Sequence, residues 1–577
     1  MENAARPDLF PPPRVKPASR RRGACLLVLL GLLPAGPAGA ADVPSALATG
    51  TAPVARGPAR ADVVRFLEQA TMGPTEALVA HVSTVGFEKY LDEQLAAPSA
   101  GYPDLPAMPG NQQVGCPEGS PATCVRDNYT MYPLQVRFFE NALKGEDQLR
   151  QRVALALHEI LVVSGVAIRQ PSAMGPYLNM LHRNALGNYR TLLNDLTVSP
   201  AMGDYLDMVN NPAAVPPANI PPNENYAREL LQLFSVGVDL LNEDGTAVRD
   251  AQGLPVPAYE QEVIEELARV FTGWTYATAA GAAARKSNPP NYKAPMWLYR
   301  DARGVDTTHD KGSKAILAYP GAPHAVLPSN QDGAVDLDQA LDDVFLHPNV
   351  GPFFGRQLIQ RLVTSNPSPA YVARVARVFG NDGRGVRGNL AAVVRAILLD
   401  PEARGPEKSD PQYGRLREPV LFVTNLCRAL DATSDNVLAA QANAMGQNVF
   451  NPPSVFSYFP PEYEVRDGVL GPEFGIQSST TTIARVNFVS ALVFNGIGRG
   501  TPTGGTALDL SKLTPFATDP ATLVAAVDRL LLHGTMTGEA ASEVAAAVAA
   551  IPASSALTRV KTAVSLVASS PAYQVAR

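Results

Sequence analysis

The sequence predicts a mainly α-helical fold: a globular array of many helices joined by long Pro/Gly-rich loops, with one or two small β-hairpins. Three observations predict it. From Asp62 onward, apolar residues recur at intervals of three and four, which is the spacing of one face of a helix. Alternation with a period of two, the pattern of a half-buried strand, is rare. The 52 prolines gather with glycine and asparagine in stretches that separate the helical segments.

The helical pattern starts with Val64, Phe66, Leu67 and Ala70. It continues in segments whose apolar residues keep the same spacing, at 87–95, 150–163, 189–196, 224–236, 261–271, 337–345, 353–363, 369–379, 390–399 and 420–429. Three further helices, rich in alanine, are predicted between 519 and 576.

One hairpin is predicted at 238–259, where Asn242-Glu243-Asp244-Gly245 supplies the turn. Loops of a length that is usually functional or disordered are predicted at 100–125, 210–223, 275–295, 318–333 and 450–480.

Composition and charge exclude several classes of protein. The chain of 577 residues is 46% hydrophobic and 18% charged, which indicates a folded protein and not a disordered one. No apolar run approaches the roughly 18 residues that a membrane-spanning helix needs. The first 40 residues hold six basic and two acidic side chains, which leaves 42 basic against 52 acidic. This acidic balance argues against nucleic-acid binding, which requires a basic surface.

The N-terminus has the three parts of a signal peptide, predicted over 1–40. Arg20, Arg21 and Arg22 precede the apolar stretch 24–33, and the small residues 38–40 favour cleavage after Ala40. The export route, general or twin-arginine, stays open. We expect a periplasmic or secreted protein with a linker at 41–61 and one large helical domain at 62–577. A sub-boundary near 400–415 is a weaker expectation, based on the break in the helical pattern there.

Cysteine usage agrees with export. Cys116 and Cys124 flank a short loop rich in proline, glycine and serine, and Cys25 belongs to the predicted signal peptide. In an oxidising compartment such a pair predicts a disulfide, whereas a metal site would need further ligands nearby. Cys427 lies in an apolar helical segment and is expected to be a buried hydrophobic residue.

Two polar clusters are candidates for a functional site. In the predicted helix 224–236, Asn225, Arg228 and Glu229 fall on the face opposite the apolar residues, and the face contains no lysine. Such a mixture of amide, carboxylate and guanidinium suits a fixed hydrogen-bond network as well as a solvated surface.

The second cluster is His309-Asp310 with Lys314, in the loop-rich middle of the chain. A histidine beside a carboxylate suits acid–base chemistry or metal binding, but it also suits a structural loop. The sequence contains no G-x-S-x-G, Walker A or C-x-x-C motif, so cofactor and metal stay unknown.

The chain resembles the bacterial family called domain of unknown function 1800. The resemblance spans roughly 62–577, and its most specific string is Asn223-Glu224-Asn225 followed by Arg228-Glu229-Leu230. The other segments that carry it are Arg65-Phe66-Leu67, Ala268-Arg269-Val270-Phe271-Thr272-Gly273-Trp274, His309-Asp310 with Lys314, His347-Pro348-Asn349, Leu362-Val363-Thr364-Ser365-Asn366-Pro367, Arg417-Glu418-Pro419 and Ser569-Ser570-Pro571-Ala572-Tyr573. Membership implies an exported, largely helical protein that is often encoded beside a sulfatase-like partner, and it implies no particular reaction.

Two functions therefore stand side by side. The first is a hydrolase-like enzyme acting on an envelope or extracellular substrate, with Glu229 as acid–base, Arg228 and Asn225 orienting the substrate, and His309 with Asp310 completing the site. The second is a non-catalytic binding or assembly protein whose polar motifs hold loops to helices. An enzyme requires the two clusters to converge on an open pocket. We expect this convergence, with Glu229 or Glu224 within a few ångströms of the 309–314 loop.

Overall fold

The structure, a computed structural model, describes residues 58–577 apart from 216–219, 407–409, 411 and 501–503. The predicted signal peptide at 1–40 and the linker as far as residue 57 lie outside the described residues. By their internal contacts, residues 57–577 belong to one unit, which includes the region of the expected sub-boundary at 400–415.

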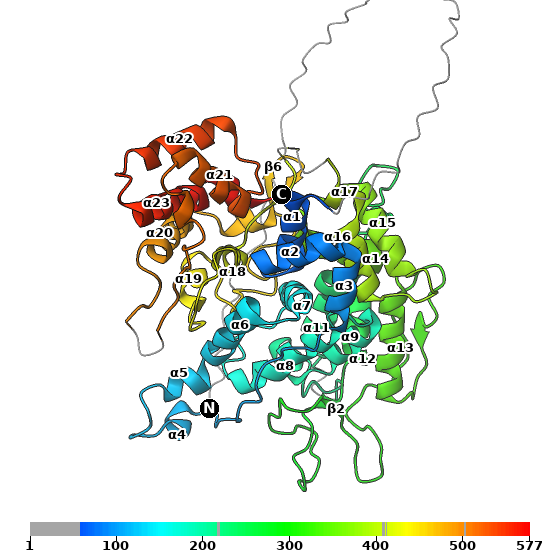
Figure 1. The fold of residues 1–577 in the computed structure, drawn as a ribbon. Coiled ribbons are helices and arrows are strands. Elements are labelled where there is room, and N and C mark those ends of the chain that lie inside the picture. The colour runs from blue at the N-terminus through cyan, green and yellow to red at the C-terminus, as the bar shows by residue number, and fades with distance from the viewer. Residues whose placement is uncertain (1–57, 216–219, 407–409, 411, 501–503) are drawn as a thin grey trace, which may run out of the picture. The chain divides into compact units, whose positions relative to one another are not determined.

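About half of the chain is helical, so the predicted mainly α fold is confirmed (Figure 1). The helices of the first half, in chain order, are α1 (Arg60–Ala70), α2 (Glu76–Val85), α3 (Phe87–Ala96), α4 (Gln112–Gly115), α5 (Cys124–Tyr129), α6 (Tyr132–Lys144), α7 (Gln148–Ile160), α8 (Pro171–Asn184), α9 (Tyr189–Thr197), α10 (Pro200–Tyr205), α11 (Asn225–Glu229), the π-helix η1 (Leu230–Ser235) and α12 (Gln261–Val270).

The second half contributes a similar number of helices. In chain order they are α13 (Gly333–Leu346), α14 (Val350–Leu362), α15 (Pro369–Gly380), α16 (Leu390–Leu399), α17 (Pro401–Arg404), α18 (Pro419–Ala429), α19 (Ala439–Ala444), the 3₁₀ turn η3 (Pro472–Ile476), α20 (Ser479–Phe494), the 3₁₀ turn η4 (Thr514–Phe516), α21 (Pro520–Leu531), α22 (Gly538–Ala549), α23 (Ala556–Ser569) and α24 (Pro571–Gln574).

Strands in the described residues are two or three residues long and form antiparallel pairs. The pairs are β1 (Trp274–Thr275) with β2 (Trp297–Leu298), β3 (Lys314–Ala315) with β4 (Val326–Leu327), β5 (Arg415–Leu416) with β8 (Val575–Ala576), and β6 (Glu464–Arg466) with β7 (Val469–Leu470). The hairpin predicted at 238–259 is present only as isolated bridges, such as Leu241 with Ala247. Each of these pairs forms a sheet of two strands only.

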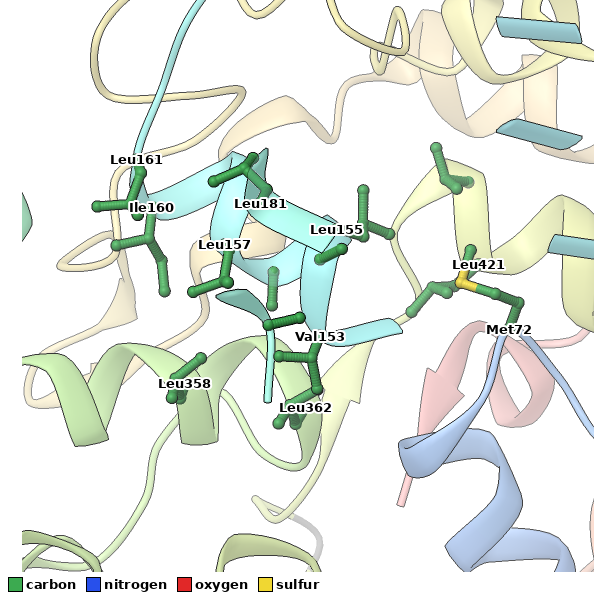
Figure 2. Packing of buried hydrophobic residues seen from close by; sticks show 14 of the residues in the cluster. Met72, Val153, Leu155, Leu157, Ile160, Leu161, Leu181, Leu358, Leu362 and Leu421 are labelled. Carbon is green, nitrogen blue, oxygen red and sulfur yellow. The ribbon is translucent and has the colours of Figure 1, made fainter. Parts of the chain in front are cut away.

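Helix α7 lies in the core, because every one of its residues except Arg150 is buried. In Figure 2, Val153 and Leu157 of α7 lie beside Leu358 and Leu362 of α14, with Leu181 of α8 nearby. Burying side chains of this kind supplies about 1.5–3 kcal/mol each relative to exposure. The C-terminal helices α21, α22 and α23 pack against one another, and α23 also packs against α20 (Figure 1).

Helices predicted from periodicity are present within a few residues of their expected bounds, but several others were not predicted, among them α2, α6, α8 and α20. Helix α8 contains Gly175 and Pro176, which look like breakers, but both lie in its first half. Helix α20 opens on three threonines, which favour strands, and the capping box between Ser478 and Thr481 starts it. Helix α6 starts with Tyr132-Pro133, shortly after α5 ends at Tyr129. The residues that obscure the helical pattern thus lie inside α8 but at the start of α6 and α20.

The cysteine predictions are confirmed. Cys116 and Cys124 form a disulfide with their Cα atoms 5.9 Å apart, and Cys427 is free and buried in α18. In the described part of the chain, no helix combines the length and the apolar character that crossing a bilayer demands.

Candidate functional site

The helix that carries the predicted polar face changes its winding halfway along. Pro221 and Pro222 precede it, and the side chain of Asn223 accepts a hydrogen bond from the backbone N–H of Asn225 at 2.9 Å. From Leu230 to Ser235 the backbone is a π-helix, in which the Ser235 hydroxyl donates to the carbonyl of Leu230. Long π-helical segments are rare and often occur at functional sites.

The two faces of this helix divide as the sequence predicts. Ala227, Leu230, Leu231 and Phe234 are buried in the core. On the other face, Arg228 donates to the Glu224 carboxylate at 2.7 Å. The side chain of Gln261, at the start of α12, bridges the same two residues, accepting from Arg228 and donating to Glu224 at 2.9 Å. The polar face is therefore a network and not a row of independent solvated side chains.

Asn225 and Glu229 lie outside this bridge. The amide of Asn225 donates to Asp207 at 2.8 Å. Glu229 is half-buried and makes no hydrogen bond or ion pair within the described residues, so burial raises its pKa while the charge of Arg228 opposes the shift. Nearby, burial and the charge of Glu229 together raise the pKa of Tyr205 to about 12. Glu229 is thus a carboxylate with a perturbed pKa, as proton transfer would require.

His309, Asp310 and Lys314 do come together, as a closed cluster. The Nε2 atom of His309 lies 3.0 Å from Oδ2 of Asp336, to which Lys314 also donates at 2.7 Å. The Nδ1 atom of His309 lies 3.0 Å from the carbonyl oxygen of Thr272. Both ring nitrogens of His309 therefore face oxygen atoms that can accept a hydrogen bond.

Charged side chains within this cluster are paired. Asp310 pairs with Arg269 at 2.9 Å, and Arg269 pairs in turn with Glu266 at 2.6 Å. The cations of Arg269 and Lys314 therefore face the carboxylates of Glu266, Asp310 and Asp336. The side chains of His309 and Asp336 are 0% exposed, so no substrate can reach them.

Two glycines allow this closure. Gly273, in the segment after α12, has φ +87°, and a Cβ on it would lie 3.0 Å from the backbone nitrogen of His309. A Cβ on Gly333 would lie 2.7 Å from Cγ of the His309 ring. Close approach of the backbone on both sides of the ring thus requires glycine at these positions.

No direct contact supports the expected convergence of the two clusters. Among the described residues no hydrogen bond or ion pair joins Glu224 or Glu229 to His309, Asp310 or Lys314. Helix α12 shows why: Gln261 at its start binds the first cluster, and Arg269 near its end binds the second. These positions are eight residues apart, or about 12 Å along the axis at roughly 1.5 Å per residue. Because each cluster is bound to a different end of α12, the helix separates them.

A third polar cluster, which residue patterns did not predict, lies in the core. Arg415 of β5 donates to Glu418 at 2.9 Å and to Glu473 at 3.0 Å, and all three side chains are buried. Glu418 also accepts from Gln447 at 2.7 Å, and Glu473 accepts from Ser365 at 2.7 Å. We call Arg415, Glu418, Glu473 and their partners the core ion network.

Helix α7 contributes to the core ion network as well. Glu159 accepts from Gln447 at 2.9 Å and lies 3.5 Å from Arg361 of α14. Burial, reinforced by the charge of Glu418, raises the pKa of Glu159 well above its usual range. Burial would raise the pKa of Glu418 too, but Arg415 lowers it to about 2. The network thus joins α7, α14, β5, α18 and η3.

Residues 65–575 match the family described as "Protein of unknown function (DUF1800)". The chain belongs to the DUF1800 family. No match is found among curated proteins or solved structures.

Most segments that carry the DUF1800 resemblance supply the residues of these clusters. Arg417-Glu418-Pro419 leads into the core ion network, and Arg269 through Gly273 surrounds His309. The Asn223 string forms the π-helical element. Within the described residues, no group of three or more His, Cys, Asp or Glu side chains is placed to hold a metal ion. The signal that could have found the core network was the run of charged residues in apolar surroundings at Arg415, Arg417 and Glu418.

Proposed function

We propose that this protein is exported and acts as a non-catalytic binding or assembly protein. One observation supports the proposal best: the charged residues of its motifs pair inside closed clusters. His309, Lys314 and Asp336 are inaccessible, and Arg415, Glu418 and Glu473 lie in the core. A catalytic acid or base has to reach the proton that it transfers, within hydrogen-bond distance.

The partner in this proposal comes from the family resemblance alone, which names a sulfatase-like exported protein. Export is supported by the predicted signal peptide and by the Cys116–Cys124 disulfide, since disulfides persist in oxidising compartments.

A hydrolase-like function stays the second candidate, because of Glu229. Glu229, at the end of α11, has no hydrogen-bond or ion-pair partner among the described residues, and its pKa is raised. The nearby Tyr259 hydroxyl is buried without a hydrogen-bond partner. A proton-transfer site of this kind would have to work without His309.

Substitution of Glu229 by glutamine distinguishes the two functions. A raised pKa means that burial disfavours the ionised carboxylate, so Glu229→Gln should leave the melting temperature unchanged or slightly higher. Glu262→Gln, on the exposed side of α12, is the matched control. Purified variants and wild type are incubated with envelope polysaccharide and peptidoglycan fractions, and products are measured by mass spectrometry. We expect no product from any of the three. A product that wild type and Glu262→Gln release and Glu229→Gln does not would establish the hydrolase instead.

Export has its own test. Intact mass measured on protein recovered from outside the cytoplasm of the producing cell should correspond to a chain that starts at Ala41, without the first 40 residues. Recovery of that protein with Met1 still present would contradict cleavage after Ala40.

A further inference from the structure

A cavity of about 680 Å³ lies between α1 and the C-terminal helices. Its volume falls within the roughly 300–1,000 Å³ that is usual for small-molecule sites. One wall is apolar and comes from α22, α23 and the turn before α22. The side chains of that wall are Leu532, Met536, Ala540, Val544, Leu566 and Val567. The opposite wall is α1, and it presents a charged residue.

That residue is Arg65, which is 4% exposed and lines the cavity. Its Nε and Nη2 atoms are buried and have no hydrogen-bond partner. Its guanidinium lies 5.9 Å from the ring centroid of Tyr413, whose hydroxyl is also buried without a partner. A buried arginine with free donors is costly, and burial indeed lowers the pKa of Arg65. An acceptor placed in the cavity would remove this cost.

Other charges near the cavity are mostly positive. The charge of Arg65 acts on Arg404, whose Nε and Nη1 atoms are likewise buried without partners and whose guanidinium lies 5.4 Å from the Phe66 ring. The guanidinium of Arg577 lines the cavity itself, as does the imidazole ring of His533.

Two carboxylates accompany these cations. Asp62 lines the cavity, and Glu68 lies behind it, 2.8 Å from Arg417 and 3.1 Å from His533. Burial alone would raise the pKa of Glu68, but Arg417 and His533 lower it to about 2. Arg417 neutralises Glu68, and Asp62 is then a single carboxylate beside the guanidinium groups of Arg65, Arg404 and Arg577, so a positive excess is left around the cavity.

We infer that this cavity binds an amphiphilic organic anion, with a carboxylate or phosphate head at Arg65 and an aliphatic body along the wall formed by α22 and α23. The head would accept the free guanidinium donors in charge-assisted hydrogen bonds, which are about twice as strong as neutral ones. The body would replace water against Leu532, Met536 and Leu566. The inference names a class of ligand for the binding function proposed above. It depends on that proposal in one respect, namely that the ligand is bound and is not chemically converted.

The test measures binding to the full mature chain by isothermal titration calorimetry and by the shift in melting temperature. The probes are octanoate, octyl phosphate, 1-octanol and inorganic phosphate. We expect one or both octyl anions to bind, with 1-octanol and inorganic phosphate weaker by at least roughly tenfold, about 1.4 kcal/mol. The octyl anion that binds more tightly identifies the head group. Equal binding of 1-octanol, or binding of inorganic phosphate as tight as that of octyl phosphate, would overturn the inference.

Variants locate the site. Arg65→Gln should weaken binding of the octyl anion at least roughly tenfold. Arg60→Gln, five residues earlier on α1 and paired with Glu76 at the surface, should bind like wild type. Ala540→Trp places a large side chain in the cavity from the exposed side of α22 and leaves the buried charges unchanged. It therefore tests whether the cavity is the binding site even if Arg65→Gln does not fold. Wild-type affinity in Ala540→Trp would rule the cavity out. That failure would leave the Glu229 experiment, and hence the non-catalytic proposal, unaffected.

Discussion

Arg415→Met should lower the free energy of unfolding by about 3–5 kcal/mol at neutral pH, the cost usually seen when one partner of a buried ion pair is removed. Methionine fills most of the volume of arginine but leaves the carboxylates of Glu418 and Glu473 without their shared cation. Both carboxylates are buried, so water cannot take its place. Urea unfolding followed by circular dichroism measures the loss.

The control for this prediction is Arg377→Met. Arg377 also pairs with a carboxylate, that of Glu243 at 3.0 Å, but the two side chains are 60% and 57% exposed. A surface pair of this kind contributes less than about 1 kcal/mol. Adding Glu418→Gln to Arg415→Met should restore part of the lost stability, since it removes one uncompensated charge. If Arg415→Met and Arg377→Met lose the same small amount, the core ion network does not stabilise the fold as we describe.

Asp336→Asn should cost about 3 kcal/mol or more, by the same removal of a buried partner. Asp336 accepts from His309 and Lys314 through one oxygen and from Gln331, at 2.6 Å, through the other. Asparagine lacks the negative charge that pairs with Lys314, and its N–H₂ group cannot accept a hydrogen bond from the partner that it faces. The loops from residue 299 to residue 333 should then open first, and limited proteolysis should cut there before it cuts elsewhere.

The same substitution should remove part of the protein's acid sensitivity. Burial alone would raise the pKa of Asp336, but hydrogen bonds from His309 and Lys314 hold it below its usual range. A carboxylate whose pKa is depressed in the folded state stabilises the protein fully above its unfolded pKa, near pH 4. That stabilisation is lost as the pH falls through the folded pKa. The difference in stability between wild type and Asp336→Asn should therefore shrink below about pH 4.

Asp338→Asn is the matched control, two residues further along α13. Asp338 pairs with Arg190, but its side chain is 68% exposed. The expected loss is below about 1 kcal/mol, and the pH dependence should stay that of wild type. A gap between wild type and Asp336→Asn that stays constant down to pH 2 would show that Asp336 does not titrate as we infer.

How far the sequence alone leads differs from element to element. Helices such as α16 and α18 were predictable within a residue or so, because a helix that buries one face repeats its apolar residues every three or four positions. The Cys116–Cys124 disulfide followed from short spacing and from a predicted oxidising compartment. The family followed from strings such as Asn223-Glu224-Asn225.

Which charged side chains meet in the interior is determined by the tertiary structure alone. Arg415, Glu418 and Glu473 are up to 58 positions apart in the chain, and the apolar surroundings of Arg415 and Glu418 do not reveal that Glu473 shares their buried site. The same holds for Asp336, which closes the His309 cluster from a helix that begins 24 residues later. Local periodicity reports which face of a helix is buried. Which charges then meet depends on how the helices pack, because the energy of an ion pair depends on distance and burial and not on separation along the chain.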